Sequence, residues 1–262
     1  MELAGYLLPL LNALWWPFCR ILALLSAAPV VGDILVPLPV RVLLALVLSF
    51  LMLPFSPGNP DIDPFSILGS VATLEQAVIG GVLGLAMHFS MSVVSVLGYL
   101  VSSQIGFSMA QMNDPVNGTA SDVVSGLLSL ISIIVFFAID GHLVLTGVLA
   151  ASFKAWPVGG GYAPLLLITI ALKAAWIFAA AILLALPIVF STLVVQLGFG
   201  LLNRVAPSLN LFSLGFSLTT LFGLLMLIQV VRFIPEHYIA MSNQVLELLQ
   251  QLMHETTEAA RG

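Results

Sequence analysis

Long apolar runs separated by short polar or turn-rich segments make up most of the chain. A membrane-spanning helix needs about 20 consecutive, mainly apolar residues. The second of the apolar runs is only marginal in length, whereas the third, fourth and fifth exceed one bilayer crossing even with a steep tilt. We therefore expect long, tilted helical hairpins that face protein as much as lipid. The predicted helices cover Leu7–Ala28, Pro39–Leu53, Ile67–Val101, Val123–Ala155, Ala163–Leu202 and Leu209–Phe233.

The basic residues do not fit a simple six-span arrangement. Membrane proteins concentrate Lys and Arg in their cytoplasmic loops. Here the basic residues are scattered singly, and alternating six spans places Lys154 and Arg204 on opposite sides of the membrane. This distribution favours helices that contact other protein surfaces as well as lipid. The residues concerned are Arg20, Arg41, Lys154, Lys173, Arg204 and Arg232.

Composition sets the class of protein. Of 262 residues, 60% are hydrophobic and 7% are charged, which is typical of a polytopic membrane protein. A net charge of −5 with seven Lys and Arg residues provides no basic patch, so nucleic-acid binding is excluded. The single cysteine, Cys19, cannot form an internal disulfide and has no metal-ligand spacing around it. We expect it to pack structurally, and we expect no cofactor.

Small residues and a polar C-terminal stretch point to helix packing. Gly80 and Gly84 form a small-xxx-small pair, and Ser95, Gly98 and Ser102 recur at helical spacing. These faces suit either contacts with partner helices or packing within this chain, and internal packing is the better explanation for any one pair.

From Pro235 onward the pattern is amphipathic and acidic, with Arg261 as its only basic residue, which favours a protein partner or water over anionic lipid.

Ionisable residues in apolar runs are candidates for function. Asp140 and His142 lie in the second half of a long apolar run and would suit a proton or cation site, which suggests a secondary transporter as an alternative function. They are two residues apart and do not share a helix face, so a capped or paired group near a helix end is the favoured account. A transporter would also show repeated halves, and none is visible. Glu75, His88 and Lys173 are similar single candidates, with pairing between helices as the simplest account.

Catalytic motifs are absent from the sequence. There is no His-Glu-x-x-His and no Walker-type Gly-Lys-Ser/Thr. Gly106-Phe107-Ser108-Met109 and Gly215-Phe216-Ser217-Leu218 begin like a nucleophile elbow but lack its closing glycine. We therefore predict that the chain is not an enzyme.

The segment from Gln104 to Thr119 is the longest polar, turn-rich interruption of the chain. Asn113-Asp114-Pro115 and Asn117-Gly118 are strong turn signals, yet the segment also contains Phe107, Met109 and Met112, which a solvated loop does not need. Irregular backbone between membrane-grade helices is tolerated where protein buries it or where it lines a water-filled cavity. A plain surface connector remains the alternative.

Several motifs together resemble the FliR family, the export-gate subunits of flagellar type III secretion, whose injectisome counterpart is SctT. The resemblance extends over essentially the full length. The motifs are Gly106-Phe107-Ser108 with Asp114-Pro115, Asp140-Gly141-His142-Leu143, Trp156-Pro157-Val158-Gly159, and Asn203-Arg204-Val205-Ala206-Pro207 followed by Leu209-Asn210-Leu211-Phe212.

The resemblance implies an all-α membrane-class protein within a multi-subunit export-gate ring. It implies a FliP-like part over 1–161 fused to a FliQ-like hairpin with an amphipathic C-terminal helix over 162–262. The loop over 103–121 would plug the pore, using Gly106, Phe107, Ser108, Met109, Met112, Asp114 and Pro115. Interface candidates are Gly80, Gly84, Ser95, Gly98 and Arg204.

The same resemblance implies partners and a location. FliP-like and FliQ-like subunits would complete the ring, FlhB would wrap its cytoplasmic mouth, FlhA would lie beneath, and rod proteins would grow from the top. Exported unfolded flagellar proteins would pass through. The assembly would belong to the flagellar basal body in the bacterial inner membrane, in contact with lipid and largely above the bilayer plane on the periplasmic side.

Overall fold

The computed structural model describes residues 2–32, 36–56, 62–107, 112–114, 119–160, 164–205 and 211–259. Contacts divide the chain into two compact units, each described by itself below. The first unit takes its described residues from 1–89, 140–173 and 242–262. The second takes them from 90–139 and 174–241.

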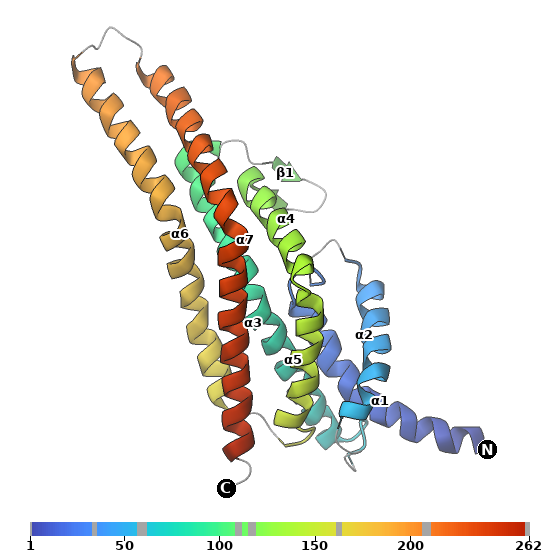
Figure 1. The fold of residues 1–262 in the computed structure, drawn as a ribbon. Helices are drawn as coiled ribbons and strands as arrows, with labels where there is room; N and C mark the ends of the chain where they lie inside the picture. The colour runs from blue at the N-terminus through green and yellow to red at the C-terminus, as the bar shows by residue number, and fades with distance from the viewer. Residues whose placement is uncertain are drawn as a thin grey trace. The chain divides into compact units, whose positions relative to one another are not determined.

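Helices dominate the described part of the chain, which confirms the predicted helical membrane class (Figure 1). Loop 103–121 also contains a short antiparallel strand pair, which the expectation of purely helical structure did not include. In chain order the elements are α1 (Glu2–Ala27), α2 (Leu38–Met52), the 3-10 turn η1 (Leu53–Phe55), α3 (Ile67–Ile105), β1 (Met112–Asp114), β2 (Thr119–Ser121), α4 (Val123–Ala138), α5 (Gly141–Ala155), α6 (Pro164–Val205) and α7 (Leu211–Ala259).

Two predicted helix boundaries are wrong. The run Val123–Ala155 is not one helix, because Asp140 adopts a left-handed conformation (φ 55°) that ends α4 and begins α5. An isolated left-handed residue cannot continue a right-handed helix. Conversely, α7 does not stop at Phe233 but continues through Pro235 to Ala259, as α6 continues through Pro187. Long helices packed among others tolerate an internal proline when neighbouring groups compensate for the lost hydrogen bond.

In the first unit, α1 lies beside α2 and crosses α3 at close range (Figure 1). A Cβ at Gly80 would collide with the main-chain carbonyl of Arg20, and a Cβ at Gly84 with that of Leu24. Small residues at these positions let the two backbones approach, as the sequence pattern predicts. The core that results is apolar and aromatic, and includes Trp16, Ile21, Leu24, Ile79, Leu83, Phe153, Trp156 and Leu249.

In the second unit, the C-terminal part of α3 packs against α4, and α6 and α7 form an antiparallel hairpin on either side of their connecting loop (Figure 1). Gly98 faces Ser125 at a distance that leaves no room for a Cβ. On α6 only one narrow face is buried, repeating every three to four residues through Ile177, Ala181, Ala185, Ile188 and Thr192. This spacing is that of a helix that packs along a single seam.

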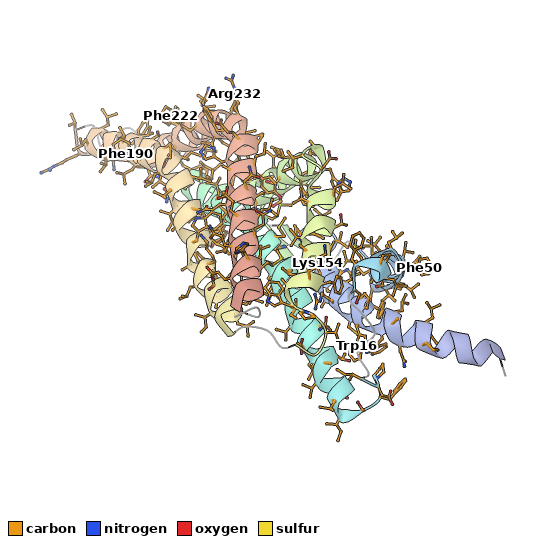
Figure 2. The ribbon with its side chains drawn as sticks, turned by 60° about the horizontal axis from the view of Figure 1, so that its bottom comes forward. Trp16, Phe50, Lys154, Phe190, Phe222 and Arg232 are labelled. Carbon is orange, nitrogen blue, oxygen red and sulfur yellow. The ribbon has the colours of Figure 1, made fainter. Side chains whose placement is uncertain are left out.

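By length and composition, five helices of the described chain suit a membrane crossing, or six if α4 and α5 form one broken span. Three are much longer than a bilayer requires: α3 has 39 residues, α6 has 42 and α7 has 49. At 1.5 Å per residue even α3 extends about 58 Å, whereas the hydrocarbon core is about 30 Å thick. Large apolar side chains also face outward, among them Phe50 on α2 and Phe190 on α6 (Figure 2). These surfaces need lipid or other protein chains to cover them.

Candidate functional site: the neck of the loop between α3 and α4

The end of α3 is fixed by Gly106. Its φ of 85° is a left-handed conformation that glycine adopts without steric cost, and it ends the helix. A Cβ at this position would lie 2.6 Å from Cε2 of Phe216 on α7, the outer edge of an exposed ring that would have to shift. The backbone angle therefore favours glycine at the end of α3, and a role of Gly106 in shaping the loop stays a prediction.

Residue Ile105, at the last turn of α3, is held against α7. Thr220 Oγ1 donates a hydrogen bond of 2.9 Å to the carbonyl oxygen of Ile105. The side chain of Ile105 is buried and lies directly against Gly223. A carbonyl at a helix end has no partner within its own helix, so the hydroxyl from α7 satisfies it. The N-terminal end of the loop thus starts from a fixed point.

Asp122 fixes the other end of the loop. It precedes α4 as its N-cap, and its Oδ2 accepts a 2.9 Å hydrogen bond from the backbone N–H of Ser125. Its Oδ1 accepts a hydrogen bond from the Ser102 hydroxyl on α3. Both side chains are buried, with 8% of Asp122 and 1% of Ser102 exposed. An acidic N-cap stabilises the helix start through the unpaired N–H groups and the helix dipole.

A row of hydroxyl groups continues this contact between α3 and α4. Ser125 Oγ donates to the carbonyl oxygen of Ser95 at 3.1 Å, and the hydroxyls of Ser95 and Ser129 are 3.3 Å apart. Ser95 and Gly98, two of the predicted interface residues, therefore face α4 of the same chain, as Gly80 and Gly84 face α1. A further part in contacts with other subunits stays a prediction.

The predicted plug residues fall only partly within the described chain. Gly106 and Phe107 are half-buried at the loop's start. Met112 and Asp114 belong to β1, which pairs with β2 in the register Met112↔Ser121, Asn113↔Ala120 and Asp114↔Thr119. Ser108, Met109 and Pro115 lie outside the described residues.

A cavity of about 450 Å³ lies beside the loop's start, within the second unit. Its walls come from the end of α3 and from the facing ends of α6 and α7. Among the described residues, the walls combine side-chain amides with aromatic rings and contain no charged side chain. The lining includes Gln104, Gln196, Asn203, Phe199 and Phe216.

Sequence reasoning missed the most heavily bonded polar residue of the first unit, Arg20. Its side chain is 0% exposed, and three of its nitrogens donate hydrogen bonds: Nε to Gln76 Oε1 at 2.8 Å, Nη1 to Ser152 Oγ at 3.1 Å and Nη2 to the Trp156 carbonyl at 2.6 Å. The guanidinium carbon lies 4.3 Å from the centroid of the Phe153 ring. Arg20 thereby joins α1 to α3 and α5.

A signal for this cluster was present in the sequence. A charged residue inside an apolar helix must find polar partners, because burying it unpaired is very costly. Gln76 and Ser152 are polar residues inside other apolar helices and were available for that purpose. What the sequence did not reveal is which helices lie next to each other.

The remaining ionisable candidates do not gather into one site. Asp140 and His142 are exposed at the break between α4 and α5, and no side-chain hydrogen bond from Asp140 caps α5. Glu75 accepts a 3.4 Å hydrogen bond from Gln76 Nε2 and so adds a negative charge next to the Arg20 cluster. Within the described ranges, no three His, Cys, Asp or Glu side chains are arranged to hold a metal ion.

Comparison with known proteins identifies the family of the chain. Residues 11–245 match the family described as bacterial export proteins, family 1. The chain is 32% identical over 248 residues to flagellar biosynthetic protein FliR of Pectobacterium carotovorum subsp. carotovorum, and 31% identical over 248 residues to that of Escherichia coli (strain K12). Each alignment covers 94% of this chain and 94% of the relative.

A more distant relative matches a smaller share of the chain at lower identity. FliR of Bacillus subtilis (strain 168) is 26% identical over 219 residues, which covers 80% of this chain and 83% of that protein. The predicted resemblance is confirmed over nearly the whole length. The chain therefore belongs to the FliR family of flagellar biosynthetic proteins, within the bacterial export proteins.

Proposed function

We propose that this chain is a channel-forming subunit of the flagellar type III protein export gate, and that loop 103–121 plugs the export pore. The observation that carries the proposal is how the loop is anchored. α3 stops at a glycine whose left-handed backbone angle other residues rarely adopt, and α4 starts at a buried aspartate bonded back to α3. A surface connector needs no such anchoring at both ends.

The loop's composition supports a sealing role. A narrow pore lined with apolar side chains excludes water and thereby blocks ions. Phe107, Met109 and Met112 are the apolar side chains that would fill the lumen, and methionine adapts to irregular gaps. Gly106 and Pro115 would set the loop's shape, while Ser108 and Asp114 would supply its turns.

The exposed apolar surface supports assembly with partner subunits. On α6 the side chains of Leu183, Phe190 and Leu197 are each at least 60% exposed, although the buried seam lies elsewhere on the helix. Such helices require covering by lipid or protein. FliP-like and FliQ-like subunits in a ring are the partners we propose, with the exposed Arg204 at the end of α6 as a further contact candidate.

The wider setting follows from the same proposal. The part over 1–161 would correspond to FliP and the part over 162–262 to FliQ. FlhB would contact the cytoplasmic mouth, FlhA would lie below it, and rod proteins would attach at the top. Unfolded flagellar proteins would pass through an assembly in the inner membrane that extends to the periplasmic side.

Deleting the residues from Gly106 to Asn117 tests the plug. In cells that make the complete export apparatus, the deletion is expected to raise potassium efflux well above wild type, because nothing apolar then fills the lumen. Replacing the same residues by an equally long Gly-Ser segment is the matched control for length and is also expected to leak. Membranes that stay tight in both variants would refute the plug.

A second test addresses assembly. It also distinguishes the proposed channel subunit from the alternative function, a secondary transporter based on Asp140 and His142. We expect the chain made alone to be unstable in detergent and to become stable when FliP-like and FliQ-like subunits are made with it. A folded, monodisperse monomer from single expression would contradict the ring. Solute uptake into vesicles by the purified chain alone, abolished by Asp140→Asn, would instead establish a transporter.

A further inference from the structure

Ser102 and Asp122 are the two residues that flank loop 103–121, one directly before it and one directly after it. Ser102 belongs to the last turns of α3, and Asp122 directly precedes α4. Their side chains are joined by a hydrogen bond in which the hydroxyl donates to the carboxylate. The bond therefore closes the loop at its base.

The buried position of this hydrogen bond makes it strong. Both side chains are buried, so water does not compete for the carboxylate. A hydrogen bond to a charged acceptor is about twice as strong as one between neutral groups, and a low local dielectric strengthens it further. The second carboxylate oxygen binds the Ser125 N–H, which orients Asp122 toward Ser102.

Two contacts from α7 hold the N-terminal end of the loop. Thr220 binds the Ile105 carbonyl, and Phe216 lies over Gly106, so α7 holds the residues just after Ser102. Neither contact holds the returning end of the loop. Within the described chain, the Ser102–Asp122 bond lies nearest to the returning end, and the bond from Ser125 to the Ser95 carbonyl follows in the first turn of α4.

We propose that Ser102 and Asp122 form a neck clasp that holds loop 103–121 in its sealing position. This inference rests on the proposed plugging function of the loop. Ser102 is a positioning residue: it acts through Asp122 and need not touch the lumen. With this bond formed, the end of α3 and the start of α4 are tied together on both sides of the loop. Without it, the Asp122 side chain no longer joins the start of α4 to α3.

Three substitutions test the clasp in cells that assemble the complete export apparatus. Ser102→Ala removes the bond and leaves the Asp122 cap on α4 intact. Ser102→Thr keeps a hydroxyl and is the conservative rescue. Ser95→Ala is the matched control, because Ser95 lies two turns earlier on α3 and its hydroxyl bonds that of Ser129 on α4, away from the neck.

The readout is potassium efflux divided by the amount of assembled gate complex in the membrane, so that lost protein does not count as a tight seal. Ser102→Ala is expected to raise this ratio by at least roughly tenfold, the factor that follows from losing a hydrogen bond to a charged group. The efflux ratio of Ser102→Ala should remain below that of the loop deletion. Ser102→Thr and Ser95→Ala are expected to stay at the wild-type value.

The outcomes separate the clasp from the plug. If the loop deletion leaks while Ser102→Ala stays tight, the clasp is refuted and the plug stands. If Ser95→Ala leaks as much as Ser102→Ala, general packing between α3 and α4 explains the effect and the clasp is refuted. If the loop deletion itself stays tight, the plugging function fails first.

Discussion

Arg20 in the first unit and Asp122 in the second are both charged groups buried against α3, but they are held in different ways. Arg20 bonds three acceptors on α3 and at the end of α5 and also lies over the Phe153 ring. Asp122 bonds one hydroxyl on α3 and one N–H of its own helix. Losing Ser152 leaves Arg20 bonded to Gln76 on α3 and to the Trp156 carbonyl at the end of α5, and losing Gln76 still leaves it held by three contacts to α5 and its end. Losing Ser102 leaves the Asp122 side chain bonded only to its own helix.

This difference bears on how easily each buried charge can be released from its partners. A charge bonded redundantly across several helices rigidifies them, because no single rearrangement releases it. A charge bonded across helices once can be released at the cost of one hydrogen bond. The charge in the first unit is therefore held by several partners, whereas the charge at the neck is joined to α3 by a single side-chain hydrogen bond.

The largest effect is expected from removing the Arg20 side chain. Arg20→Leu leaves the buried Gln76, Ser152 and Trp156 carbonyl without their donor, and should lower the free energy of unfolding by about 3–5 kcal/mol. The measurement is chemical denaturation of the protein held in detergent together with its partner subunits. Arg20→Lys should recover only part of the loss, because an ammonium cannot span the same acceptors.

Two controls sharpen that prediction. Arg232→Leu removes an arginine that projects from α7 into the surroundings, and should change stability by less than about 0.5 kcal/mol (Figure 2). Ser152→Ala removes one of the three acceptors, and should cost about 1 kcal/mol because the other two remain. If Ser152→Ala costs as much as Arg20→Leu, the redundancy of the cluster is disproved.

The next largest effect concerns the close approach of α1 and α3. Gly80→Ala places a methyl group against the Arg20 carbonyl and should cost about 1–3 kcal/mol, because the helices must separate. Gly81→Ala is the matched control: a Cβ there meets nothing within 4 Å, and alanine favours a helix over glycine by up to about 1 kcal/mol. The thermal unfolding temperatures of the two variants should therefore shift in opposite directions from that of the wild type. Equal shifts would show that the approach does not depend on Gly80.

Sequence reasoning succeeded where the signal was local and failed where it depended on neighbours. The apolar runs located the helices, and the small residues Gly80 and Gly84 indicated a close helix approach, because both signals lie in consecutive residues. The Arg20 cluster and the Ser102–Asp122 bond could not be derived, since they join residues more than 15 positions apart. The break at Asp140 was also missed, because aspartate permits but does not require a left-handed conformation.

A smaller effect is expected at the loop's start. Gly106→Ala forces a side chain into a left-handed conformation and against the Phe216 ring, at a cost of about 1–2 kcal/mol. The strain is relieved if the residue leaves its position, so potassium efflux per assembled complex should rise. Gly126→Ala in α4, where a Cβ meets nothing within 4 Å, is the control and should stay tight. Equal efflux in both variants would contradict the fixed start of the loop.

The smallest effect is expected at Asp140, and it distinguishes a backbone role from a chemical one. If the left-handed conformation is what matters, Asp140→Gly and Asp140→Asn should change stability by less than about 0.5 kcal/mol and leave flagellar protein export intact, since both residues adopt it readily. Asp140→Val should cost about 1–2 kcal/mol, because a β-branched residue disfavours it. If the carboxylate carries ions, the order reverses: Gly and Asn would abolish function as completely as Val, and swimming motility of the variants would report which order holds.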